Sequence, residues 1–263
     1  MRIAANSDGY TAEDIAALRS MWDRDTNFLL SGSCVPFDYT FPPLHEVVDR
    51  LRKDEDTRVR CADKSVDDES FARDFRSMPI ERAMEAPFAV AHFKLTHFTG
   101  RRDILFGLWD GVMRPWTNFL STAGFSWYRC YPIIFISSSH MKGNYHMDGS
   151  YVVAWQIYGT KIFNGFADPE SITPLEQAIV PEYRKAITKP ENPDDSSVLG
   201  FEMPPGTVLW NQLLTPHWVD AGDDGEPAMS LNISHGGLRC DGVLSRRGEA
   251  IESRYREYPE ERF

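Results

Sequence analysis

Residues 143–150 read GNYHMDGS, and this stretch sets His146 two positions before Asp148. On a β-strand, side chains two positions apart project from the same face, so this imidazole and this carboxylate can converge on one ion. The glycines on either side suit a strand edge where the backbone leaves room for ligands. An HxD triplet is common by chance, so the interpretation depends on the sequence around it.

A third ligand is offered by His217, in the segment PPGTVLWNQLLTPHWVDA at 204–221. The turn Pro204-Pro205-Gly206 precedes a strand-like run at 207–210, and a short loop then leads to His217. Two histidines and one carboxylate form the facial triad that binds non-haem iron and leaves coordination positions open. The sequence therefore predicts that His146, Asp148 and His217 bind a metal and form the catalytic centre.

Strand-like segments surround these residues after Phe125. They are rich in β-branched and aromatic residues and bounded by Gly, Pro or Asp: WYRCYPIIFIS (127–137), YVVAWQIYGTKIFNGF (151–166), GTVLWNQ (206–212) and AMSLNIS (228–234). Strands without long helices between them favour an antiparallel sandwich or barrel. An acidic, Pro-rich insertion at about 168–199, with a helix expected around LEQAIVPEYRKAI (175–187), interrupts them.

Two further polar residues complete a pattern. Lys161 lies thirteen residues beyond Asp148, and Asn232 lies fifteen beyond His217. In order and spacing, HMD, QIYGTK, PPGTVLW…PHWV and SLNIS resemble the JmjC and cupin-like 2-oxoglutarate oxygenases. Within that family the spacing is similar to that of the asparaginyl hydroxylase acting on hypoxia-inducible factor. The resemblance covers about residues 126–240.

The resemblance implies a fold, mainly β with helical additions, whose core is a double-stranded β-helix (a jelly-roll of the cupin/JmjC type). It implies Fe(II) bound by the three residues above, 2-oxoglutarate as cosubstrate, and O2. It also implies that Lys161 pairs with the distal carboxylate of 2-oxoglutarate and that Asn232 lies near the cosubstrate and the metal. A long cationic side chain suits a carboxylate partner.

The sequence departs from the resembled pattern at Gly143, where the similar hydroxylase has a hydroxyl-bearing residue that helps to bind the cosubstrate. Asn144, Tyr128 and Ser137 are the alternatives for the missing hydrogen bond, and we expect Asn144 and Tyr128 to be cosubstrate-binding residues. If Gln156 and Lys161 lie on one strand, the alternation of side chains puts Gln156 on the face opposite to Lys161.

The rest of the chain is expected to form two outlying parts. Residues 1–125 are predicted to be a mainly helical region packed on the core, with one helix capped by Thr11 and another beginning near Pro43. Residues 241–263 are expected to be a charged, solvated helix or tail. The first part and the 168–199 insertion are expected to wall the mouth of the barrel.

Composition limits the class of partner. The chain has 263 residues, a net charge of −11 and a pI of about 5.1, which disfavours non-specific binding to nucleic acid. No stretch approaches the roughly 20 apolar residues that cross a bilayer, and no secretory signal is visible at the start. Four cysteines without CxxC spacing indicate reduced thiols. We expect a cytoplasmic protein with no membrane or nucleic-acid partner, and a homodimer is an open alternative.

The expected reaction is hydroxylation of an unactivated C–H bond with release of succinate and CO2, as the resemblance implies; desaturation and cyclisation stay open. A small molecule, such as an amino acid or a natural-product intermediate, is the substrate expected first, and a protein or peptide side chain is the alternative. A non-catalytic, cupin-like metal- or ligand-binding protein is the alternative of another class. Lys161 and Asn232 count against it, because an inert metal binder needs no partner for a distal carboxylate.

Overall fold

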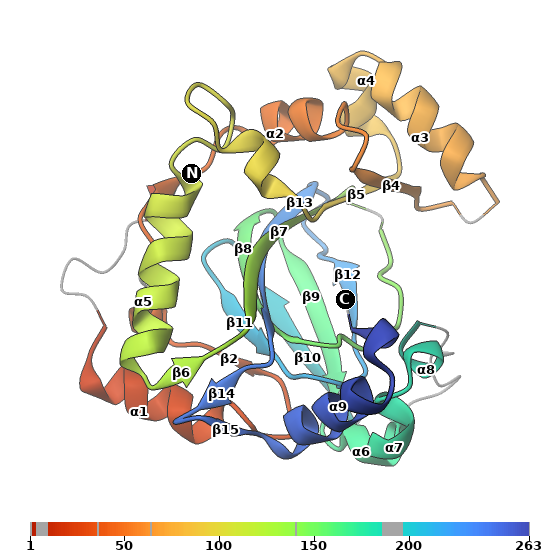
Figure 1. The fold of residues 1–263 in the computed structure, drawn as a ribbon. Coiled ribbons are helices and arrows are strands. Elements are labelled where there is room, and N and C mark those ends of the chain that lie inside the picture. The colour runs from red at the N-terminus through yellow and green to blue at the C-terminus, as the bar shows by residue number, and fades with distance from the viewer. Residues whose placement is uncertain are drawn as a thin grey trace.

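The computed structural model describes residues 2–3, 10–35, 37–63, 65–139, 141–185 and 197–262. Two antiparallel sheets lie at the centre of the molecule, and helices surround them (Figure 1). No helix among these residues is both long enough and apolar enough to cross a membrane.

The larger sheet contains seven strands of the described chain, and each pairs antiparallel with its neighbours. Their order is β2 (Phe28–Leu29), β11 (Val208–Asn211), β8 (Tyr151–Tyr158), β13 (Ala228–Gly236), β7 (Arg129–Ser137), β5 (Phe88–His92) and β4 (Arg58–Cys61). The smaller sheet has the order β10 (Val198–Met203), β9 (Lys161–Phe166) and β12 (Trp218–Ala221). Short pairings join β1 (Arg2–Ile3) to β3 (Tyr39–Thr40), and β14 (Arg239–Cys240) to both β15 (Val243–Leu244) and β6 (Phe125–Ser126).

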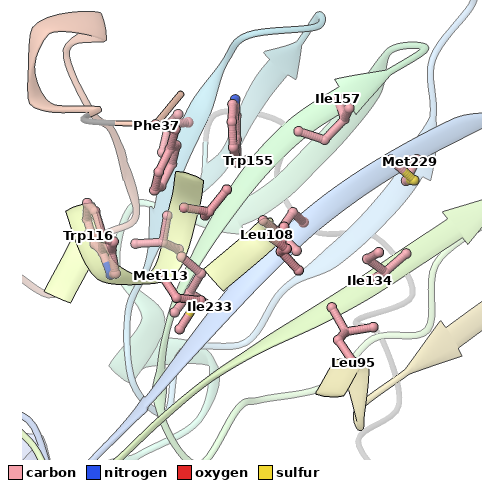
Figure 2. Packing of buried hydrophobic residues seen from close by; sticks show 14 of the residues in the cluster. Phe37, Leu95, Leu108, Met113, Trp116, Ile134, Trp155, Ile157, Met229 and Ile233 are labelled. Atoms are coloured by element: carbon pink, nitrogen blue, oxygen red, sulfur yellow. The ribbon is translucent and has the colours of Figure 1, made fainter. Parts of the chain in front are cut away.

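The outer face of the larger sheet carries the main hydrophobic core. Alternate residues of β8 and β13, including Trp155 and Ile233, pack against Phe37, Leu108 and Trp116 from the first half of the chain (Figure 2). Phe37 stacks on Trp155 with ring centroids 4.2 Å apart. Large aromatic side chains of this kind bury 150–250 Å² each, so they hold the helices firmly on this face.

The inner face of the larger sheet meets the smaller sheet through a second, smaller cluster. Ala154 and Leu209 from the larger sheet pack there against Phe163 and Met203 from the smaller one. Polar side chains occupy the same inner space, because the alternation that points Leu231 outward points its neighbours on β13 inward. The space between the sheets can therefore hold a polar ligand.

Helices form as the sequence predicts at the start of the chain. They are α1 (Ala12–Met21), α2 (Leu44–Leu51), α3 (Asp68–Ser77), α4 (Ile80–Glu85), and α5 (Arg114–Thr122), which continues a π-helical turn at Trp109–Met113. Thr11 caps α1 by accepting a hydrogen bond from the amide of Asp14, whose carboxylate accepts the amide of Thr11 in return. Pro43 directly precedes α2.

The prediction of a mainly helical residue range 1–125 missed strands that extend the larger sheet. β2, β4 and β5 come from this range. β2 has two residues, too few to show alternation. In β4 the exposed positions are Arg58 and Arg60, so the segment resembles a charged surface loop in sequence.

The C-terminal helix α9 (Arg246–Glu257) is not a solvated tail. Ile251 and Tyr255 are buried in the main core, and Arg247 and Glu252 are buried as well. The charges that suggest a solvated helix are paired instead: Arg254 with Glu261, and Glu252 with Arg262. A charged helix forms as predicted, but it is not solvated, because ion pairs allow a highly charged helix to pack on a core.

The 168–199 insertion packs on the outside of the smaller sheet. It contains α6 (Pro169–Ile172), α7 (Leu175–Ala178) and α8 (Pro181–Lys185), where one helix was expected at 175–187. Pro181 begins a new helix instead of continuing the old one, and residues 186–196 lie outside the described part of the chain. Ile172 and Val198 contact an aromatic cluster on the outer face of that sheet, made of Tyr145, Phe166 and Trp218. Among the described residues of the insertion, the carbonyl of Arg184 also accepts a hydrogen bond from the amide of Met147 at 3.3 Å, so α8 lies against the segment that carries His146 and Asp148. The expectation that the first part of the chain and the insertion wall the mouth of the barrel stays a prediction.

Candidate metal and cosubstrate site

The segment that carries His146 runs beside the beginning of β12, and a mutual pair of backbone hydrogen bonds fixes this arrangement. The amide of His146 donates to the carbonyl of His217 at 3.0 Å, and the amide of His217 donates back at 2.9 Å. Asp148 follows two residues later and approaches both rings. Its Oδ1 lies 3.7 Å from Nε2 of His146, and its Oδ2 lies 3.6 Å from Nε2 of His217.

These three side chains offer donor atoms that all lie within 4.8 Å of one another. Two metal–ligand bonds of about 2.1 Å span up to about 4.2 Å, so the contacts to Asp148 suit a shared ion. Two neutral imidazoles and one carboxylate are the donors of the iron-binding facial triad. The residues present therefore fit a divalent iron ion.

Main-chain carbonyls set the tautomer of each histidine. Nδ1 of His146 lies 2.8 Å from the carbonyl of Asn144, and Nδ1 of His217 lies 2.9 Å from the carbonyl of Thr215. A carbonyl only accepts, so each Nδ1 carries the proton and each Nε2 presents a lone pair. Hydrogen bonds of this kind orient metal-binding imidazoles in known sites.

The environment keeps His217 neutral. Its side chain is 3% exposed, and its ring stacks on Phe163 with centroids 5.0 Å apart. Burial, together with the nearby His146, lowers the pKa of His217 to about 4. A neutral, desolvated imidazole is the form that binds metal.

Asn211, at the end of β11, holds the carboxylate. Its side-chain amide donates to Oδ2 of Asp148 at 2.9 Å, and Asn211 is 1% exposed. This bond fixes the plane of the carboxylate and leaves Oδ1 free on the side of His146. The sequence did not single out Asn211, although it stands six residues before His217.

Lys161 begins β9 between the two sheets and is 6% exposed. Its ammonium group donates to the carbonyl of Phe135 at 3.3 Å and to the hydroxyl of Ser230 at 3.2 Å. Among the described residues no carboxylate pairs with it. Burial lowers the pKa of Lys161 to about 7. A buried cation without a counter-charge is costly, so this site favours an anionic ligand.

The inner face of β13 supplies polar groups next to Lys161. Ser230 and Asn232 share this face, and the side-chain oxygen of Asn232 is buried without a hydrogen-bond partner among the described atoms. The buried cation of Lys161 has no counter-charge among the described residues, and this fits a ligand that carries negative charge. The positions of these polar groups fit a dicarboxylic acid that reaches from Lys161 toward His146 and His217. The sequence analysis missed Ser230, two residues before Asn232.

The structure explains Gly143. A Cβ atom there would lie 2.1 Å from the carbonyl oxygen of Val219 and 2.6 Å from its nitrogen. The segment therefore approaches β12 too closely for any side chain, and a hydroxyl-bearing residue cannot stand at this position.

The two other residues expected to bind cosubstrate lie elsewhere. Asn144 is exposed, and its carbonyl orients His146. Tyr128 is 46% exposed, donates its amide to the carbonyl of Gly236 at 3.1 Å and packs under Arg262. The structure does not bring Tyr128 to Lys161, because the β13 end that it contacts is opposite the Ser230 end.

The expectation for Gln156 was wrong. Gly159, with φ of 60°, ends β8, and Lys161 starts a new strand, so counting along one strand fails. Gln156 lies opposite Ser230 in the register, on the inner face. Its amide donates to the carbonyls of Tyr158 and Gly159 and closes the turn.

A second group of metal-type side chains, formed by Asp54, His92 and His97, has a different role. The amide of Lys94 donates to Nδ1 of His92 at 3.1 Å, so Nε2 carries the proton and donates to Asp54 at 3.1 Å. Binding a metal there would require an imidazolate. His235 is likewise satisfied, by the indole of Trp116 and the carbonyl of Tyr151. His140 lies outside the described residues.

No family model matches the chain, and no curated protein sequence matches it. Solved structures do match the chain. An X-ray structure of E. coli YcfD matches with a TM-score of 0.56 at 15% identity, covering 93% of this chain and 56% of that chain. The E. coli ribosomal oxygenase YcfD in complex with cobalt and 2-oxoglutarate matches with a TM-score of 0.53 at 15% identity, covering 97% and 57%. The same enzyme with cobalt and succinic acid matches with a TM-score of 0.54 at 14% identity, covering 97% and 57%.

The chain thus spans somewhat more than half the length of these proteins. At such low identity the likeness is one of fold. Mostly antiparallel sheets with added helices agree with the β-rich, JmjC/cupin-like fold that the sequence predicts. The chain has the fold of the YcfD oxygenase structures.

Proposed function

We propose that this chain is an Fe(II)- and 2-oxoglutarate-dependent oxygenase that hydroxylates a side chain of a protein. His146, Asp148 and His217 would hold the metal, and Lys161 would hold the distal carboxylate of 2-oxoglutarate, with Asn232 beside it. The observation that carries this proposal is the combination, on the smaller sheet, of a two-histidine, one-carboxylate cluster beside β12 with a buried and uncompensated lysine on the neighbouring strand β9.

The fold supports the proposal. The strand order β7-β13-β8-β11 in one sheet faces β12-β9-β10 in the other, and the His146 segment adds to β12. We infer that these strands form a double-stranded β-helix. YcfD structures with this fold were solved with cobalt and 2-oxoglutarate or succinic acid.

Each residue has a defined part in the proposed reaction. The Nε2 atoms of His146 and His217, with the carboxylate of Asp148, would hold the ion. The ammonium of Lys161 and the hydroxyl of Ser230 would fix the far end of the cosubstrate. Phe163 excludes water from the His217 side. Bound Fe(II) with 2-oxoglutarate and O2 supplies the oxidising power for C–H hydroxylation, with succinate and CO2 as by-products.

The expectation of a small-molecule substrate is wrong. The matching structures are of a ribosomal oxygenase, which indicates a protein substrate. The side chain of His146 is 42% exposed and that of Asp148 is 31% exposed. An open mouth of this kind admits a side chain presented on a polypeptide.

The proposal is tested with purified protein, Fe(II), ascorbate and 2-oxoglutarate, with and without a ribosomal protein fraction. We expect succinate release that rises with the protein fraction and is lost in Asp148→Ala. Succinate release equal in wild type and Asp148→Ala would contradict the proposal.

A further inference from the structure

The loop that runs from Asn211, the last residue of β11, to His217, just before β12, has an unusual backbone at Leu214. This residue has φ of 59°, in the left-handed region that costs a leucine about 1 kcal/mol or more. Its side chain is fully buried. Its amide donates to the carbonyl of Asp148 at 2.9 Å, so the strained residue ties the loop directly to a proposed metal ligand.

Arg247, in the first turn of α9, binds the carbonyl end of the same residue. Its guanidinium donates to the carbonyl of Leu214 at 3.2 Å, and its side chain is 5% exposed. The same group reaches Asp25 and Glu170, each at 3.3 Å. These carboxylates come from the segment before β2 and from α6, so three distant segments converge on the metal-binding loop.

The beginning of α9 is itself anchored to the larger sheet. Ser245 caps the helix, and its hydroxyl bonds to the hydroxyl of Tyr151, the first residue of β8. Tyr151 follows Asp148 by three positions. In Figure 1, α9 lies beside α6 and α7, at the edge of the two sheets. The start of α9 is therefore fixed by β8, the strand that follows Asp148. From there Arg247 donates a hydrogen bond to the loop that precedes His217.

We propose that Arg247 is a positioning residue that sets the approach of His217 to Asp148, so that metal affinity depends on the C-terminal helix. The inference rests on the proposed metal site. Without the guanidinium, the carbonyl of Leu214 loses its buried partner and the strained peptide loses the bond that opposes its relaxation. A shift of the loop then moves His217 away from the 3.6 Å contact with Asp148.

The test compares Arg247→Met, Arg247→Lys and Arg246→Met in the full chain, with Mn(II) and Co(II) as probes. Arg246 is a matched control, because it also pairs with Glu170 but its side chain is 67% exposed and it does not contact Leu214. Loss of a residue that orients metal ligands typically lowers affinity about 10–100-fold, and we expect this loss for Mn(II) in Arg247→Met. Arg246→Met should bind Mn(II) as the wild type does.

The absorption spectrum of bound Co(II) separates positioning from general stability, because it reports the geometry of the ligands. We expect an altered spectrum in Arg247→Met, and partial recovery in Arg247→Lys, whose single ammonium can reach only some of the acceptors. Wild-type affinity and spectrum in Arg247→Met would overturn the inference. Should that variant not fold, unchanged affinity and spectrum in Arg247→Lys would overturn it. Absence of metal binding by the wild type would instead refute the proposed function.

Discussion

Each proposed histidine ligand is oriented by a carbonyl two residues earlier in the chain, that of Asn144 for His146 and that of Thr215 for His217. The same local hydrogen bond thus orients two proposed ligands that are 71 positions apart in the sequence. Spacing in the sequence predicted these ligands. It could not predict Asn211 or Ser230, because their roles follow from which strands become neighbours.

His146→Ala and His217→Ala should each lose bound metal while keeping the fold, because each removes one Nε2 donor from the cluster. Metal content of the purified proteins, with circular dichroism as a check on folding, decides this. His97→Ala is the control, since His97 is 41% exposed and lies in the separate Asp54 cluster. Normal iron content in both ligand variants would remove the basis for the assignment.

Lys161 should make 2-oxoglutarate binding depend on pH. Because burial holds its pKa near 7, the empty site loses its positive charge as pH rises above about 7, and the anion then binds more weakly. The stability of the free protein depends on pH in the opposite direction. Between pH about 7 and 10.5 the unfolded chain binds more protons at Lys161 than the folded chain does, so the free energy of unfolding rises with pH. Calorimetric titration of Mn(II)-loaded protein below and above pH 7 measures the binding effect. An equal pH dependence in Lys161→Met would show that another group causes it.

At the scale of elements, close contact between strands explains features that residue types alone do not. The His146 segment lies flat on β12 only because Gly143 has no side chain. The turn at Gly159 separates β8 from β9 and puts Gln156 and Lys161 on different strands, which a run of β-type residues could not reveal. Likewise, β2 and β4 form because the edges of the larger sheet are available to short segments.

Gly143→Ala should push the His146 segment off β12 and weaken Mn(II) binding at least about tenfold, as expected for a change that displaces a metal ligand. Gly200→Ala, in β10, is the matched control, because a Cβ atom there meets only the side chain of Asn164 at 3.7 Å. Mn(II) titrations of both variants, with melting temperatures, make the comparison. Equal metal affinities would mean that the close approach to Val219 does not position His146.

At the scale of the whole molecule, the arrangement of the outlying parts decides the kind of substrate. The composition of residues 1–125 and of the insertion predicted helices but not the faces that they cover. The charged C-terminal segment looked solvated, yet α9 packs on the core and reaches the metal-binding loop through Arg247. Such packing depends on contacts between distant segments, which a single sequence does not display.

The open mouth predicts that folded proteins are hydroxylated and free amino acids are not. After incubation of ribosomal proteins with enzyme, Fe(II) and 2-oxoglutarate, mass spectrometry should find a peptide heavier by one oxygen atom. The Asp148→Ala variant should leave the same peptide unmodified. Stoichiometric hydroxylation of a metabolite, with no modified peptide, would count against the proposed substrate class.

Calorimetric titration of 2-oxoglutarate tests most directly whether the metal and Lys161 form one cosubstrate site. The titration is made into Mn(II)-loaded wild type, into metal-free wild type and into Mn(II)-loaded Lys161→Met. If one cosubstrate joins the metal to Lys161, binding requires the metal, and the lysine variant binds roughly ten- to hundredfold more weakly, as expected for loss of a charge-assisted hydrogen bond. Equal affinity in all three titrations, or no binding to the Mn(II)-loaded wild type, would contradict the account.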